Sequence, residues 1–94
     1  MASRIQTFTA DVVSGQRAPS VVVPFDPERT WGLAPTPQPF FDGEVPGWPV
    51  KGLFGGHRFQ GAIGRRWGKH FLLLPEGTEA TLGSRVQVIV EPRL

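Results

Sequence analysis

Apolar and polar residues alternate near the start of the chain. Between residues 5 and 13, apolar positions such as Phe8 and Ala10 are separated by threonines and an aspartate. A period of two with this threonine content is typical of a half-buried strand. A β-branched run within residues 20–25 predicts a second short strand. It ends at Pro24, because proline cannot donate a hydrogen bond to a sheet.

The second half of the chain contains three further strand patterns. Residues 50–63 alternate around Gly55-Gly56, which predicts a β-hairpin whose two turn residues both have positive φ. Residues 64–68 predict another turn, and 69–74 a buried strand. Residues 85–91 give the clearest alternation, with three valines on the face expected to point inward.

Residues 26–49 lack a clear period. Asp26 and Pro27 predict one helical turn, with Asp26 as its N-cap and Pro27 in the first position. The rest is rich in proline and is expected to be a long irregular loop, a kind of segment that is often functional. Four aromatic residues lie in it, and exposing them would cost about 1.5–3 kcal/mol each: Trp31, Phe40, Phe41 and Trp48. The loop therefore either folds back over the core or contacts a partner through these four residues.

The pattern predicts one all-β domain spanning residues 1–94. The 94 residues include 12 glycines and 10 prolines, which favours many turns and no long helix. We expect a small closed or split β-barrel of about six to seven short strands with at most one helical turn. The expected core consists of Phe8, Val22, Phe54, Phe59, Phe71, Val86 and Val88.

Composition removes several classes of function. The chain has no cysteine, which excludes disulfides, a thiol nucleophile and cysteine-ligated metals. No apolar run reaches the length of about 18 residues of a membrane span, and no secretory leader pattern is visible, so we expect a cytoplasmic protein without membrane contact. His57 and His70 lack metal-ligand spacing, and Asp42 and Glu44 are expected to be solubilising residues. We therefore expect no enzymatic activity, metal or cofactor.

Charge is unevenly distributed along the chain. The net charge is +2, but no acidic residue occurs from Val45 to Pro75, where five of the ten basic residues lie. Such a segment can be an ordinary solvated surface or a surface that attracts anions. Basic side chains interleaved with aromatic rings are typical of small barrels that hold single-stranded nucleic acid. The candidate residues for binding nucleic acid or another anion are Arg58, Arg65, Arg66, Trp67 and Lys69.

A protein-interaction module is the alternative interpretation. Residues 35–39 form a short proline-rich segment that could bind a partner in a polyproline conformation. The adjacent Phe40-Phe41 pair is unfavourable to expose, so the same loop could instead pack on a second copy of the chain. This interpretation predicts a homodimer.

Four segments resemble a small bacterial domain family of unknown function. They are Phe8-Thr9-Ala10, Val22-Val23-Pro24, the run from Trp48 to Phe59, and the run from Lys69 to Pro75 followed by Leu82 to Val88. Together they cover about two-thirds of the chain. The family is sometimes fused ahead of a bacteriocin-protection-type domain. The resemblance implies a barrel similar to the split barrels of AbrB-like transcription regulators, and hence a relationship to DNA-binding proteins.

The chain departs from that family in one segment. Members usually carry a short Lys/Arg-rich helix before the last strand, followed by a Gly-Asp turn. Here only residues 76–82 fill the gap, and Ser84 stands where the aspartate would be. Because this helix is not matched, no role tied to it is carried over. The proline-rich stretch also resembles an insertion.

Overall fold

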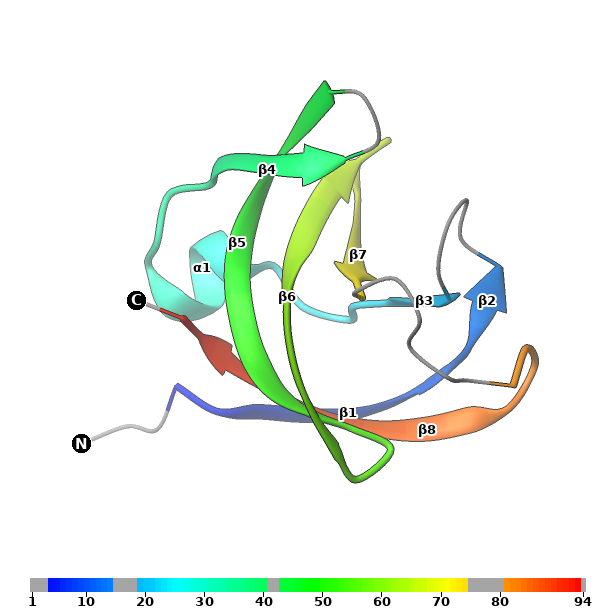
Figure 1. Cartoon of the computed structure of the whole chain (residues 1–94). Helices are drawn as coiled ribbons and strands as arrows, with labels where there is room; N and C mark the ends of the chain where they lie inside the picture. Colours follow the sequence, from blue (N-terminus) through cyan, green and yellow to red (C-terminus); the bar gives the residue numbers. More distant parts are fainter. Residues whose placement is uncertain (1–3, 15–18, 41–42, 75–80, 94) are drawn as a thin grey trace.

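The computed structural model describes residues 4–14, 19–40, 43–74 and 81–93. It is a small all-β domain with very little helix, as expected (Figure 1). The elements are β1 (Gln6–Asp11), β2 (Val13–Ser14), β3 (Pro19–Val22), α1 (Pro27–Trp31), β4 (Thr36–Phe40), β5 (Gly43–Phe54), β6 (His57–Arg66), β7 (Lys69–Leu73) and β8 (Arg85–Pro92). Within the described residues, no helix is long and apolar enough to span a bilayer.

All the strands belong to one sheet that curls into a nearly closed barrel. Seven strands follow the order β1-β8-β5-β6-β7-β3-β2, and β4 pairs separately with β5. The first and last strands of this path, β1 and β2, are separated in the chain only by Val12. Val12 bridges to the turn before β8, where its N–H donates to the Ser84 carbonyl at 2.8 Å. The chain therefore bends at Val12 to connect the two edges of the sheet (Figure 1).

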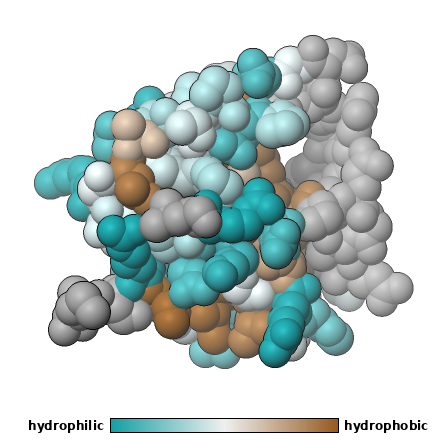
Figure 2. Space-filling view, turned by 60° about the vertical axis from the view of Figure 1, so that its left-hand side comes forward, coloured by the Kyte–Doolittle hydropathy of each residue, from teal (hydrophilic) through white to brown (hydrophobic). Residues whose placement is uncertain are grey.

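The core lies inside the barrel, with α1 packed at one end. Its most buried residues come from β3, β5, β6, β7 and β8 together with the two inner tryptophans, Trp31 and Trp48. Both indole N–H groups donate to backbone carbonyls, Trp31 to that of Arg4 at 2.7 Å and Trp48 to that of Leu33 at 2.8 Å. Trp31 also packs edge-on against Phe25, with ring centroids 5.3 Å apart. Figure 2 brings the α1 side of the molecule forward, and the middle of this side is mainly hydrophilic, with apolar residues along its lower edge.

The predicted helical turn is confirmed as α1. The Asp26 side chain accepts a hydrogen bond from the Glu28 N–H at 2.9 Å, and Pro27 occupies the first position. The helix ends at Gly32, whose φ of 67° lies in the left-handed region. The hairpin turn at Gly55-Gly56 is also confirmed, with φ values of 57° and 87°.

The prediction of an irregular loop over residues 26–49 is wrong, because β4 and the first part of β5 form a hairpin there. β4 pairs with β5 alone, which makes it an edge strand. Pro37 lies opposite Pro46, and neither can donate, so this pair takes a position without ladder hydrogen bonds. The backbone nitrogens of Pro37 and Pro39 then point to the open edge of the sheet, where the missing N–H of a proline removes no ladder hydrogen bond.

The expected core is right for five residues and wrong for Val22 and Phe71. Phe54 and Val88 are buried, and Phe8, Phe59 and Val86 pack partly buried against them. Val22 is 44% exposed because the neighbouring Val21 and Val23 point inward instead. Phe71 pairs with Val22 and is half-buried on the outer side of the sheet.

The turn predicted over residues 64–68 is shorter than expected. β6 continues to Arg66, so the turn is confined to Trp67 and Gly68. Most of the segment 76–82, which stands in place of the family's basic helix, lies outside the described residues.

Candidate nucleic-acid interface

The alternation of β6 divides the predicted basic residues between two faces. The pairing of β6 with β5 and β7 is regular from His57 to Arg66. Ile63 is fully buried in the core, so residues of opposite parity lie on the outer face of the sheet. This outer face of β6 consists of Arg58, Gln60, Ala62, Gly64 and Arg66. Arg65 has the parity of Ile63 and lies at the mouth of the barrel.

Arg65 belongs to a polar cluster that joins α1 to the sheet. Its guanidinium lies 3.7 Å from a Glu28 oxygen and 5.7 Å from the Trp48 ring centroid. His70, paired with Arg65 across the ladder, has its Nε2 atom 3.7 Å from Asp26 Oδ1. That Nε2 atom is buried and has no hydrogen-bond partner among the described residues. The acidic partner makes Arg65 a structural contact of α1 rather than part of an outer basic surface.

The β6–β7 tip, residues Arg66 to Lys69, carries three of the other four candidates. Trp67 and Gly68 form a two-residue turn with φ values of 54° and 72°. Positive φ at both residues is the signature of a type I′ hairpin turn. Trp67 is 76% exposed, and the Arg66 guanidinium lies 4.2 Å from its ring centroid. Lys69 pairs directly with Arg66, so two cations flank one exposed indole.

The position of Trp67 is unfavourable for folding. Among the described residues it is the one non-glycine with positive φ. Such a conformation costs an L-residue about 1–2 kcal/mol, and type I′ turns prefer asparagine or glycine there. The hairpin between β5 and β6 meets the same requirement with Gly55 and Gly56. The turn therefore does not need an indole, and strain of this kind is often found at functional positions.

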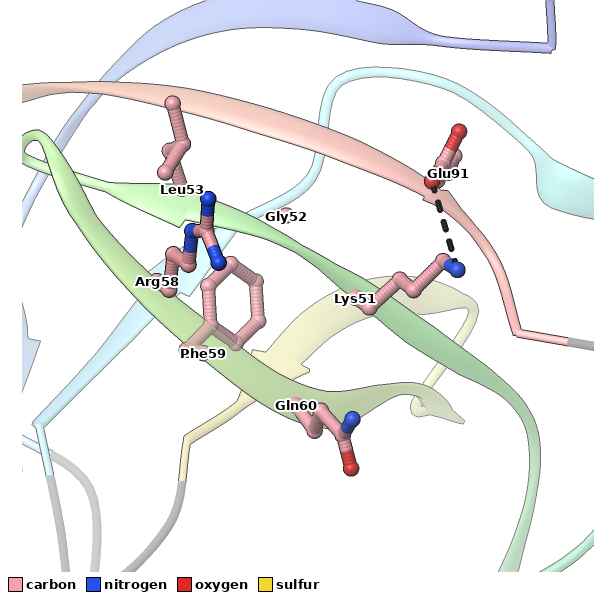
Figure 3. A pocket seen from close by; sticks show the side chains of 7 residues that line it. All are labelled: Lys51, Gly52, Leu53, Arg58, Phe59, Gln60 and Glu91. Carbon is pink, nitrogen blue, oxygen red and sulfur yellow. Dashed lines mark ion pairs between the residues drawn. The ribbon is translucent and has the colours of Figure 1, made fainter.

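Arg58 lies at the far end of β6, beside an open hollow of about 580 Å³. This Gly52 hollow is lined by β5, β6 and β8 and is drawn in Figure 3. Lys51 and Arg58 lie on opposite sides of Gly52, and the Lys51 ammonium is 3.7 Å from a Glu91 oxygen. Arg93 lies next to the hollow, where it donates to the Gln60 side chain at 3.1 Å. The structure therefore separates Arg58 from the β6–β7 tip and gives it other basic neighbours.

The structure places Trp31 and Trp48, two of the four candidate interface residues, in the core of the barrel. They are 7% and 1% exposed, because the stretch folds back over the core. The side chain of Phe40 and the whole of Phe41 lie outside the described residues. The proline-rich segment 35–39 lies mostly in β4, paired with β5 in a sheet rather than presented as a separate polyproline segment.

The histidines do not converge on a common site. His57 is exposed at the start of β6, whereas His70 pairs with Arg65, eight residues further along that strand. At about 3.3 Å per residue, this spacing corresponds to about 26 Å. Within the described residues, no group of three metal-ligating side chains comes together. Asp42 lies outside them.

Comparison with known proteins adds no assignment. No protein-family model matches the chain, and no curated protein matches it. The resemblance to the small bacterial barrel family therefore stays a prediction, and the site is argued from its geometry alone.

Proposed function

We propose that this protein is a non-catalytic binding module for single-stranded nucleic acid, with the β6–β7 tip as its contact surface. The observation that carries the proposal is Trp67, which is 76% exposed in a backbone conformation that disfavours it. Folding gains little from an indole at this position, so a role in binding accounts for it better. We also propose a cytoplasmic location, where such a ligand is available.

The residues of the tip suit a nucleic-acid strand. The Arg66 guanidinium lies against the Trp67 ring, and the exposure of Trp67 leaves room for a base to stack on the indole. A base stacked on an aromatic ring contributes about 1–3 kcal/mol and requires no particular sequence. Arg66 and Lys69, opposite each other in the ladder, supply positive charge for the adjacent phosphates. The expected ligand is therefore an unpaired strand with little sequence preference.

A titration with labelled oligothymidylate tests this proposal. If two phosphates are engaged by Arg66 and Lys69, the slope of log affinity against log salt is about −1.4 for a short single strand. Trp67→Ala is expected to weaken binding by about 1–3 kcal/mol. Arg29→Ala removes an exposed cation from α1 and is the control, with affinity close to that of the unmodified protein.

Two further ligands make the titration decisive. A duplex of the same length hides its bases and is expected to bind less tightly than the single strand. Vesicles containing anionic phospholipid test whether the exposed tryptophan and its cations bind a membrane surface instead. Binding to vesicles without binding to oligonucleotide, or equal affinity of Trp67→Ala and the unmodified protein, would overturn the proposal.

A further inference from the structure

We propose that the Gly52 hollow is a second phosphate-binding site for the same nucleic-acid strand, which then extends along the whole outer face of β6. This inference rests on the proposed function and specifies its ligand: a single strand long enough to reach from the β6–β7 tip to Arg58. The hollow and the tip lie on the same side of the sheet, because Arg58 and Arg66 have the same parity on one regular strand.

The hollow has the charge and the space for a phosphate. Lys51, Arg58 and Arg93 bring three positive charges, and Glu91 brings one negative charge 3.7 Å from Lys51. The net charge of these four side chains is +2, and it is carried mainly by Arg58 and Arg93, which form no ion pair within the described residues. The hollow of about 580 Å³, lined by Lys51 and Arg58 on either side of Gly52, leaves room for a phosphate (Figure 3).

The surface between the two basic groups is small and uncharged. Ala62 and Gly64, the middle residues of this face, are buried, and Leu73 and Val45 cover Gly64 from the neighbouring strands. Glu44 is the one acidic residue in the described parts of β5, β6 and β7, and its parity puts it on the opposite side of β5 from Val45. A strand crossing this middle region therefore meets apolar contacts and no like charge, which suits sugars and bases rather than phosphates.

The spacing of the two groups sets the length of the ligand. Arg58 and Arg66 are eight residues apart, which corresponds to at most about 26 Å along a strand. At about 3.4 Å per stacked nucleotide, that span corresponds to about eight nucleotides, and a more extended strand needs fewer. This length lies within the range of about 4–16 nucleotides that a small barrel covers.

A length series on the unmodified protein measures the number of occupied sites. We expect affinity for oligothymidylate to rise steeply up to about eight nucleotides and then to level off. Strands of about four nucleotides engage only the tip and give a salt slope of about −1.4, whereas strands of about 16 nucleotides also engage Arg58 and Arg93 and give about −2.8. Between about 50 and 200 mM salt, the longer strand loses about 50-fold in affinity and the shorter strand about 7-fold.

Variants of the hollow test the assignment of residues. Arg58→Ala combined with Arg93→Ala is expected to return the slope of the long strand to about −1.4 while leaving the short strand unaffected. Arg29→Ala combined with Arg85→Ala removes the same charge elsewhere and is expected to keep the steep slope. Glu91→Gln, which releases Lys51 from its ion pair, is expected to tighten binding of the long strand only.

The outcomes separate this inference from the proposed function. If no oligonucleotide of any length binds, both are wrong. If short and long strands bind with one affinity and one salt slope, or if the Arg58/Arg93 variant leaves the slope of the long strand unchanged, the tip is the whole site and the second phosphate site is refuted.

Discussion

Replacing Trp67 by asparagine is expected to stabilise the folded protein and to weaken its binding to single-stranded oligonucleotides. The two effects have separate origins. Trp67 has a φ of 54° at the first position of a type I′ turn, where asparagine is preferred. Its side chain is the proposed stacking platform for a base, which asparagine cannot replace.

The expected stabilisation follows from two opposing terms. Removing left-handed strain from a bulky residue gains about 1–2 kcal/mol, of which asparagine recovers most. Losing the contact between Trp67 and the Arg66 guanidinium costs about 0.5–1 kcal/mol at an exposed position. Little buried area is lost, because the side chain is 76% exposed. The net gain is about 0.5–1 kcal/mol, which raises Tm by about 2–8 °C for a domain of this size.

Urea unfolding followed by tryptophan fluorescence measures this change, since Trp31 and Trp48 remain as buried reporters. The midpoint should rise with no change in the m-value. Trp67→Ala is the matched comparison, because alanine keeps the left-handed strain and loses the ring, and it should be less stable than the unmodified protein by about 0.5–1 kcal/mol. A Trp67→Asn protein that is clearly destabilised, or that binds oligonucleotide as tightly as before, would refute the argument that Trp67 is retained for binding.

Three further substitutions test the fold. Gly52→Ala places a Cβ 1.8 Å from the Ile89 carbonyl oxygen, so β5 and β8 must separate, and the free energy of unfolding should fall by about 3 kcal/mol or more. Gly32→Ala is the control: its Cβ meets nothing within 4 Å, and its positive φ should cost only about 1 kcal/mol. Val21→Ala should lower the free energy of unfolding measured in urea by about 2 kcal/mol, whereas Val22→Thr on the exposed side should change it by less than about 0.5 kcal/mol. Equal effects would contradict the register of β3. Asp26→Ala should lower the stability measured by thermal unfolding by about 1 kcal/mol, whereas Asp26→Asn, which keeps the cap, should lower it much less. The reverse order would exclude capping as the role of Asp26.

Period-two alternation predicted the strands well where it was long. β1 and β8 have burial patterns that alternate as the sequence does. The run Val21 to Val23 is different, because three consecutive valines have no internal period and do not show which of them points inward. A shift of one residue exchanges the two faces of a strand, so the sequence predicts Val22 in the core, whereas Val21 and Val23 occupy it.

The hairpin of β4 and β5 could not be predicted because its signal depends on the partner strand. Proline is normally evidence against a strand, and β4 contains Pro37 and Pro39. Their positions are tolerated only because β4 pairs on one side and the prolines face the other. For a related reason the sequence leaves open whether Trp48 is buried or contacts a partner. Its burial depends on the Leu33 carbonyl, which the return of the chain brings to its indole N–H.

The candidate site was predicted as a set of residues but not as a surface. The segment from Val45 to Pro75 has five basic residues and no acid, but the fold brings acids to it from other parts of the chain. Glu91 of β8 pairs with Lys51, and Glu28 of α1 pairs with Arg65. These long-range pairs are invisible in the sequence, and they reduce the positive charge at two positions that the sequence weighs equally with the rest.

Neighbouring arginines in β6 show why the remaining charge is concentrated on one side. Arg65 and Arg66 are adjacent in the chain, yet the pleat turns them to opposite faces of the sheet. Arg65 reaches Glu28 and the Trp48 ring at the barrel mouth, where it helps hold α1 in place. Arg66 stacks on Trp67, on the same outer face as Arg58. Since one arginine connects structural elements and the other supports an exposed indole, substituting Arg65 should mainly lower stability, and substituting Arg66 should mainly lower affinity for single strands.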